Sequence, residues 1–271
     1  MTSPAELPAV YISHGSPMVA VEKDDYARAL GRMGESLPLP RAIVIVSAHW
    51  ESPAPVRVGL SPMPETIHDF GGFPEELYRL RYPSPGLPTL GAEIQALLAQ
   101  AGIPSVGDER RGLDHGAWVP LLHAYPGAEI PVVQVTLPQP RSPSSLLALG
   151  EALEPLRKQG ILLIGSGGIV HNLRRVHFGD KNAPVDAWAK SFDTWVRSRL
   201  ESGDVASIAD YQAQAPDSER SVPTTEHFDP LFVVLGAAGK GGRIQDLYEG
   251  FQYGNLSMRT FAVTPSASSK R

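Results

Sequence analysis

Three histidines, His14, His49 and His171, each come shortly after an apolar run rich in β-branched residues. Such runs are typical of buried strands, and here they are residues 9–13, 42–47 and 161–165. The carboxyl ends of parallel strands form the crevice in which open α/β sheets bind ligands. One histidine at a strand end usually serves as a hydrogen-bonding residue, but three at successive strand ends predict a shared site. His227 directly precedes the predicted helix 229–238 and is expected to lie over the same crevice.

The chemistry available to such a cluster is metal binding, because three or four neutral imidazoles can hold Zn or Fe. The chain has no cysteine, which excludes thiolate zinc sites, iron–sulfur ligation and a cysteine nucleophile. Ligands must therefore come from His, Asp or Glu. His123 and His177 fall in an apparent helix and a polar loop, and are interpreted as structural.

Two further segments, 66–74 and 111–118, contain more His, Asp, Gly and aromatic residues than a passive connection requires. Long loops over a crevice commonly supply substrate contacts. The residues expected to face a substrate are His68, Asp69, Phe73, Asp114 and His115. Ordinary packing is the alternative for the aromatic side chains of both segments.

The elements that must position these residues alternate between strands and helices. Two more strands are predicted at 131–137 and 259–263, and helices at 89–101, 144–159, 185–201 and 229–238. This order predicts a single α/β domain spanning residues 1–271, with a mainly parallel sheet covered by helices on both faces. Residues 202–225 are weakly patterned and are expected to form a surface excursion, and residues 264–271 a mobile tail.

Composition excludes several classes of protein. The formal net charge is −5, which argues against a nucleic acid or an anionic membrane as the main partner. No stretch approaches the roughly 18 apolar residues that a membrane helix needs, and the N-terminal residues do not resemble a signal peptide. A cytoplasmic protein is therefore expected. Dinucleotide-binding, P-loop and nucleophile-elbow motifs are absent or incomplete, since Val170 stands where the third glycine of a GxGxxG motif would be.

Six blocks together resemble the class III extradiol ring-cleavage dioxygenases, and more closely their 4,5-DOPA dioxygenase branch. The blocks are HGSPM (14–18), SAHW (47–50), TIHDFGGFP (66–74), LDHG (113–116), VHN (170–172) and EHF (226–228). They occur in the family's order, and the resemblance extends from about Val10 to Met258. One departure is Thr225, which stands where a proline commonly precedes the Glu-His pair and leaves the backbone of that loop in question.

The resemblance implies a catalytic function and the residues that perform it. His14, His49 and His227 match the family's metal ligands. His171 matches its acid/base histidine, which in some members is a further zinc ligand, and His115 matches a histidine near the substrate oxygens. The implied reaction is cleavage of a small catechol by O₂ to a hydroxymuconic semialdehyde. One divalent metal ion per chain is expected, Zn(II) as isolated and Fe(II) for oxygenase activity.

Two alternatives stay open at this point. A zinc hydrolase could use the same metal site, with Glu226 or Asp114 as the base beside a zinc-bound water. A non-catalytic metal-binding protein could also be built on this fold. The expected partners are a small catechol and O₂, with no nucleic acid and no membrane, and the chain is expected to be a monomer or a small homo-oligomer.

Overall fold

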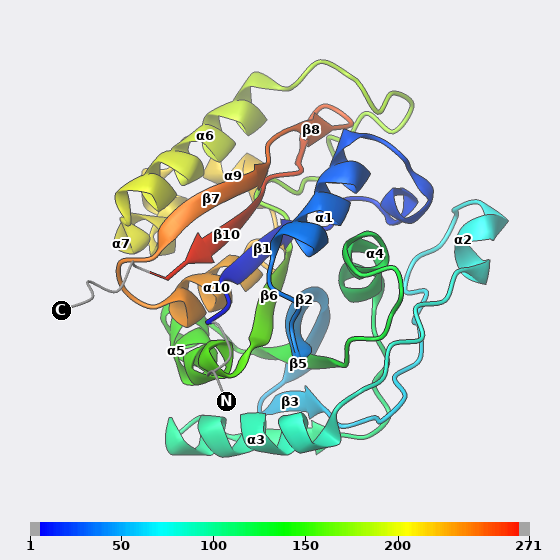
Figure 1. Ribbon diagram of the computed structural model, residues 1–271. Coiled ribbons are helices and arrows are strands. Elements are labelled where there is room, and N and C mark those ends of the chain that lie inside the picture. Colours follow the sequence, from blue (N-terminus) through cyan, green and yellow to red (C-terminus); the bar gives the residue numbers. More distant parts are fainter. Residues whose placement is uncertain (1–5, 266–271) are drawn as a thin grey trace.

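The protein is described here by a computed structural model that covers residues 6–265. Its centre is an eight-stranded sheet with the strand order β4-β3-β5-β2-β6-β1-β10-β7 (Figure 1). The strands are β1 Ala9–Ser13, β2 Ala42–Pro53, β3 Val56–Gly59, β4 Ser105–Asp108, β5 Val132–Gln139, β6 Ile161–Gly167, β7 Arg243–Tyr248 and β10 Thr260–Thr264. Strands β5, β2, β6 and β1 are parallel neighbours, whereas β3 pairs antiparallel with β5, and β10 with both β1 and β7. The predicted α/β fold with a mainly parallel sheet is therefore confirmed.

Helices cover both faces of the sheet, as Figure 1 shows. Tyr11 and Val44 belong to a hydrophobic cluster with helices α3, α5, α6 and α10, while Val10 and Ile43 belong to a second cluster with α1 and α4. Burial on both faces explains why the central strands are continuous apolar runs rather than alternating ones. The helices are α1 Asp25–Ser36, α2 Glu75–Arg79, α3 Pro88–Gln100, α4 His115–Ala124, α5 Pro143–Leu153, α6 Ala187–Ser202, α7 Val205–Ala209, α8 Tyr211–Gln214, α9 Ser218–Ser221 and α10 Pro230–Ala238, with short 3₁₀ helices at Pro17–Val21 and Glu154–Gln159.

The register of the central strands brings their carboxyl ends together. Ser13 at the end of β1 pairs with Gly167 of β6, and Ser47 of β2 pairs with Ser166 of β6. The predicted strand 42–47 was too short, because β2 continues to Pro53 after a shift in its register with β5 between Val46 and Glu51. His49 lies in this irregular part of β2 rather than after the strand.

Several elements differ from the sequence prediction for identifiable reasons. Residues 202–225, the expected surface excursion, contain α7, α8 and α9, which were not predicted because they are too short to give an apolar period. The predicted helix 144–159 is an α-helix only to Leu153 and continues as a 3₁₀ helix. The segment 111–118 was expected to be a loop, yet α4 begins at His115, and its nearly complete burial removes the amphipathic pattern. A small hairpin, β8 Phe251–Gln252 with β9 Leu256–Ser257, was not anticipated.

Helix α1 packs closely on α4 at Gly34. Alanine at Gly34 and alanine at the nearby Gly31 are therefore expected to have opposite effects on stability. A Cβ on Gly34 would lie 1.9 Å from the Ala124 carbonyl oxygen, whereas one on Gly31 meets nothing nearer than 3.7 Å. We expect Gly34→Ala to lower the free energy of unfolding by about 1–3 kcal/mol. Gly31→Ala is expected to raise it by up to about 1 kcal/mol, because alanine favours the helix. Urea unfolding of both variants tests this, and equal effects would contradict a steric role for Gly34.

In the described part of the chain, no helix combines the length and apolarity needed to cross a membrane. Thr264 ends β10. Most of the expected mobile tail, residues 266–271, lies outside the described residues.

Candidate functional site

Three histidines from distant parts of the chain converge at the carboxyl ends of the strands. His14 follows β1, His49 lies in β2 and His227 precedes α10, and each offers a ring nitrogen within 4.8 Å of those of the other two. The Nε2 atoms of His14 and His49 are 3.0 Å apart. Two nitrogens bound to one ion at the usual imidazole distance would be about 2.9–3.4 Å apart. The arrangement therefore has the dimensions of a metal-binding site.

Neighbouring groups fix which nitrogen of each ring can bind a metal. The Ser166 hydroxyl donates to the Gly116 carbonyl and therefore accepts from His14 Nδ1, which is 3.0 Å away. Glu226 Oε1 lies 3.0 Å from His227 Nδ1 and accepts its proton. Both rings are thus held with the lone pair on Nε2, as an outer-shell carboxylate or hydroxyl does for metal-bound histidines.

The fit of a cation is supported by two further observations. Among the described residues, the buried Nε2 of His227 has no hydrogen-bond partner. Asp69 Oδ2 lies 3.7 Å from His49 Nδ1, which favours a lone pair on His49 Nε2 opposite that of His14. Two lone pairs 3.0 Å apart repel unless a cation lies between them. The donor set is therefore suited to a divalent metal ion.

Burial keeps these imidazoles in the form that binds metal. It lowers the pKa of His14 and of His227 well below the usual 6.5, and the neighbouring histidines lower both further. Burial and the nearby His115 lower the pKa of His49 to about 4. All three rings are therefore neutral near pH 7, with a lone pair available to a metal.

His171 does not join this group of ligand nitrogens. Its ring stacks on that of His227, with centroids 3.5 Å apart and planes inclined by only 8°. Imidazole binds metal through a lone pair in its own plane, so an ion in the plane of the His227 ring lies out of the plane of His171. A role of His171 as a further metal ligand therefore stays a prediction, and the stacked arrangement does not support it. Burial lowers its pKa to about 4, so it is neutral and can accept a proton.

His115 and Asp69 form a pair next to the three histidines. Asp69 Oδ1 accepts the backbone N–H of His115 at 2.9 Å, and Oδ2 lies 3.0 Å from His115 Nδ1. Burial alone would raise the pKa of Asp69, but its close contacts with His115 lower that pKa to about 2. The carboxylate is therefore ionised and directs the Nε2 of His115 away from itself. Asp69 is thus placed to orient His115.

Asp114 and His68 lie in hydrogen-bonded positions, and neither is among the residues that line the cavity described below. Asp114 is fully buried and caps α4, where it accepts from Ala117 N at 3.2 Å, from Ser47 Oγ at 2.7 Å and from Gln134 Nε2. His68 Nε2 lies 3.1 Å from the Leu80 carbonyl. Its ring packs against Phe70 and Trp118, behind the wall of the cavity.

Thr225, which stands where a proline was expected, closes the turn before His227 through hydrogen bonds. The Thr225 carbonyl accepts the backbone N–H groups of Phe228 and Asp229, each at 2.9 Å. Its hydroxyl donates to Asp229 Oδ2 at 2.7 Å. Thr225 therefore supplies hydrogen bonds that stabilise the turn carrying His227.

A cavity of about 560 Å³ opens above the histidines. Phe73 and His115, two of the residues predicted to face a substrate, line it. Other lining residues were not singled out as substrate contacts, because they come from segments far apart in the chain: Met18, Phe70, Leu173, Phe178, Tyr253 and Leu256. Phe70 could have been found from the sequence because it lies in the motif block 66–74. Nothing in the sequence spacing of Tyr253 and Leu256 indicates that they line the same cavity as Phe70.

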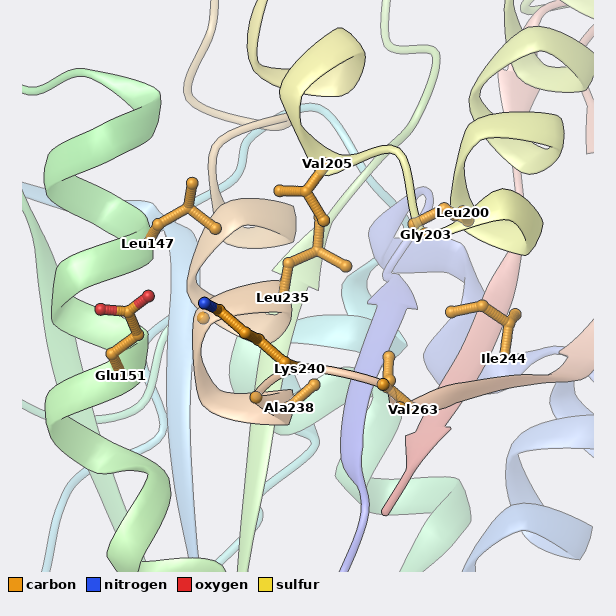
Figure 2. Close-up of a pocket in the computed structure, with 14 residues that line it drawn as sticks. Leu147, Glu151, Leu200, Gly203, Val205, Leu235, Ala238, Lys240, Ile244 and Val263 are labelled. Atoms are coloured by element: carbon orange, nitrogen blue, oxygen red, sulfur yellow. The ribbon is translucent and has the colours of Figure 1, made fainter. Parts of the chain in front are cut away.

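A second cavity, of about 400 Å³, lies between α5, α7, α10 and β7. Figure 2 shows its mainly apolar wall, with the Lys240 ammonium group and the Glu151 carboxylate on the same side. None of the described residues that line it is a histidine. The chemistry is therefore concentrated at the first cavity.

The fold and the histidine site agree with a known class of enzymes. Residues 8–259 match the family described as the catalytic LigB subunit of aromatic ring-opening dioxygenase. This match covers nearly the whole chain, and the chain belongs to that family.

Individual relatives point in the same direction. The chain is 39% identical to a 4,5-DOPA dioxygenase extradiol from Beta vulgaris, over 94% of this chain and 95% of the relative. It is also 39% identical to the 4,5-DOPA dioxygenase extradiol of Escherichia coli K12, over 96% of each. The crystal structure of an uncharacterized protein from Escherichia coli K12 superposes with a TM-score of 0.81 at 35% identity, covering 95% of this chain and 99% of that one.

Proposed function

We propose that the protein cleaves the ring of a small catechol with O₂, at the bond next to the two hydroxyl-bearing carbons, to give a hydroxymuconic semialdehyde. The observation that carries the proposal is the group of three imidazole nitrogens, from His14, His49 and His227, at a cavity also lined by His115 and His171. Membership of a family of aromatic ring-opening dioxygenases supports the same reaction.

His14, His49 and His227 would hold one divalent metal ion. When bound, Fe(II) would supply open coordination positions for the catechol and O₂, and the one-electron chemistry that a direct reaction between these two molecules lacks. Zn(II) suits the same nitrogens but has no redox chemistry. We therefore propose Fe(II) for oxygenase activity and Zn(II) as the metal in protein isolated without added iron. Ser166 and Glu226 keep two of the ligand rings in the correct tautomer.

The remaining histidines handle protons. His171 is neutral in the buried site, so it can accept a proton from a catechol hydroxyl and return it later to an oxygen of the opening ring. His115, with its Nδ1 next to the Asp69 carboxylate, presents Nε2 as an acceptor for the second hydroxyl.

The hydrolase alternative is less consistent with the geometry. It needs a free carboxylate beside a metal-bound water. Glu226 is bonded to His227 Nδ1, on the ring edge away from Nε2, and to the Thr224 hydroxyl. Asp114 is buried beneath α4, where its oxygens accept from Ser47, Gln134 and Arg111. Both candidate bases are thus already engaged.

The direct test is anaerobic loading with Fe(II), followed by oxygen and a panel of catechols. We expect consumption of O₂ and a ring-opened product that carries both atoms of isotopically labelled O₂. Protein loaded with Zn(II) serves as the control and is expected to bind catechol without consuming O₂. Hydrolytic activity of the zinc form, with no product from the iron form, would overturn the proposal.

Asp69→Asn tests the role assigned to the Asp69–His115 pair. The amide would donate to His115 Nδ1 and move the ring proton to Nε2, so the acceptor for the catechol hydroxyl would be lost. We expect kcat/KM to fall about 10–100-fold, the usual effect of an outer-shell change, with the metal content retained. Asp25→Asn, at an exposed position on α1, is the control. Loss of metal from Asp69→Asn would instead assign Asp69 to support of His49.

A further inference from the structure

Part of the wall of the main cavity is built from three segments that are far apart in the chain. Met18 lies in the 3₁₀ helix Pro17–Val21 and Phe178 in the loop between β6 and α6. Tyr253 lies in the turn between β8 and β9. All three side chains line the cavity. The shape of this part of the wall therefore depends on contacts that hold the three segments together.

Lys181, in the loop between β6 and α6, connects the three segments. Its ammonium nitrogen lies 2.5 Å from Glu22 Oε2, directly after the 3₁₀ helix, and 2.6 Å from Asp24 Oδ2, at the N-cap of α1. Its carbonyl accepts the backbone N–H of Tyr253 at 2.8 Å. One lysine thus joins all three parts of the wall, although its own side chain does not line the cavity.

The two ion pairs of Lys181 are partly shielded from water. The exposed fractions of the side chains are 25% for Lys181, 17% for Glu22 and 30% for Asp24. Burial alone would lower the pKa of Lys181, but its contacts with the two carboxylates raise that pKa above the usual value, so the ammonium group stays charged. Without this cation, two carboxylates would face each other and repel. Removal of the charge is therefore expected to move the segments apart.

The backbone of Tyr253 depends on the same loop. Its φ is 53°, a left-handed conformation that is rare for an aromatic residue. Hydrogen bonds hold it from both sides, because its N–H donates to the Lys181 carbonyl and its own carbonyl accepts from the His177 N–H at 3.0 Å. Residues held in such conformations occur preferentially at ligand-binding sites. Residues 177–181 thus support Tyr253 in a conformation that its two-residue strands alone do not fix.

We propose that Lys181 is a positioning residue for substrate binding, which holds Tyr253 and Phe178 in the wall where they contact the substituent of a bound catechol. The cavity of about 560 Å³ has room for a catechol with a substituent, such as the DOPA in the names of the relatives. Because the two hydroxyls are bound at the histidines, Lys181 acts on affinity and not on ring cleavage. The inference rests on the proposed function and adds a residue that determines substrate binding.

Lys181→Met tests the proposal, because it removes the cation and keeps a side chain of similar length. The Kd for DOPA is measured anaerobically by calorimetry on the Zn(II)-loaded protein, and KM and kcat on the Fe(II)-loaded protein. We expect Kd and KM to rise about tenfold, the size of one lost contact in a pocket. The metal content and kcat should change little, because the lost interaction is the same before and during the reaction. Lys181→Arg keeps the cation and should keep most of the affinity.

Hydrogen exchange follows the same wall without any ligand. We expect the peptide that contains Tyr253 to lose protection in Lys181→Met. Lys158→Met is the matched control, since Lys158 is paired with Glu154 at 2.8 Å and does not line the cavity, and it should change neither the exchange nor the affinity. Glu22→Gln removes one partner of Lys181 and replaces Lys181→Met if that variant does not fold. It should weaken DOPA binding about two- to fivefold, the size of one partly exposed ion pair.

The outcomes separate the inference from the proposed function. An unchanged Kd in Lys181→Met would overturn the inference, and so would a fall in kcat at constant Kd, because Lys181 would then act on the reaction. Weaker DOPA binding in this variant, with no O₂ consumption by the iron form of the unmodified protein, would support the inference and reject ring cleavage. Cleavage of other catechols by an unmodified protein that does not bind DOPA would overturn the inference and keep the proposed function.

Discussion

His227→Ala is expected to remove the bound metal ion and to abolish ring cleavage. His227 supplies one of three nitrogens, and its Nε2 is buried with no other partner among the described residues. Two remaining histidines form a weak and incomplete site. The loss in activity should exceed the 10–100-fold that changes outside the ligand sphere cost. Metal content per chain after dialysis is measured first, and turnover with Fe(II) second.

Two other variants are expected to reduce metal binding less than His227→Ala does. Glu226→Ala leaves the His227 ring in place but removes the acceptor at Nδ1, and should weaken metal binding by about 10–100-fold. His177→Ala removes a histidine that does not line the cavity, and should leave the metal content unchanged. A His227→Ala protein with one ion per chain would show that the metal lies elsewhere.

The meeting of His14 and His49 was predictable because it depends on strand ends, which apolar runs mark clearly. His14 follows β1, whose residues are all buried. The parallel register of β1 with β6 fixes the position of His14 along the strand direction. His49 was found for the same reason, although β2 continues beyond it. The pattern of buried strands thus determines which histidines can meet.

The outer residues of the site could not be predicted in the same way. Asp114 precedes a histidine in a motif block, and the same residue type serves equally well as a helix cap, which is its position here. A capping aspartate and a substrate contact look alike until the helix is recognised, and α4 is too completely buried to show an amphipathic period. Tyr253 reaches the cavity from the β8–β9 hairpin, where two-residue strands leave no pattern.

His171→Ala in the Fe(II)-loaded protein is expected to retain metal and to bind catechol, yet to lose ring cleavage by roughly 10²–10⁴-fold, the usual contribution of a general acid/base. His171 lies outside the group of ligand nitrogens, so its removal does not open the metal site. Burial lowers its pKa to about 4, so the ring is neutral near pH 7, and we propose that it accepts a proton from a catechol hydroxyl. Metal content, anaerobic catechol affinity and turnover are measured on the same preparation.

A second variant, His171→Phe, separates proton transfer from packing. The ring of His171 lies flat on that of His227, 3.5 Å away, and phenylalanine would keep this stack while removing both nitrogens. If His171 transfers protons, the Phe and Ala variants lose cleavage to the same extent and both keep their metal. If its role is to hold His227 in place, the Phe variant keeps both metal and turnover while the Ala variant loses both. A parallel stack with a ligand ring thus makes the two roles distinguishable, because only one of them depends on the imidazole nitrogens.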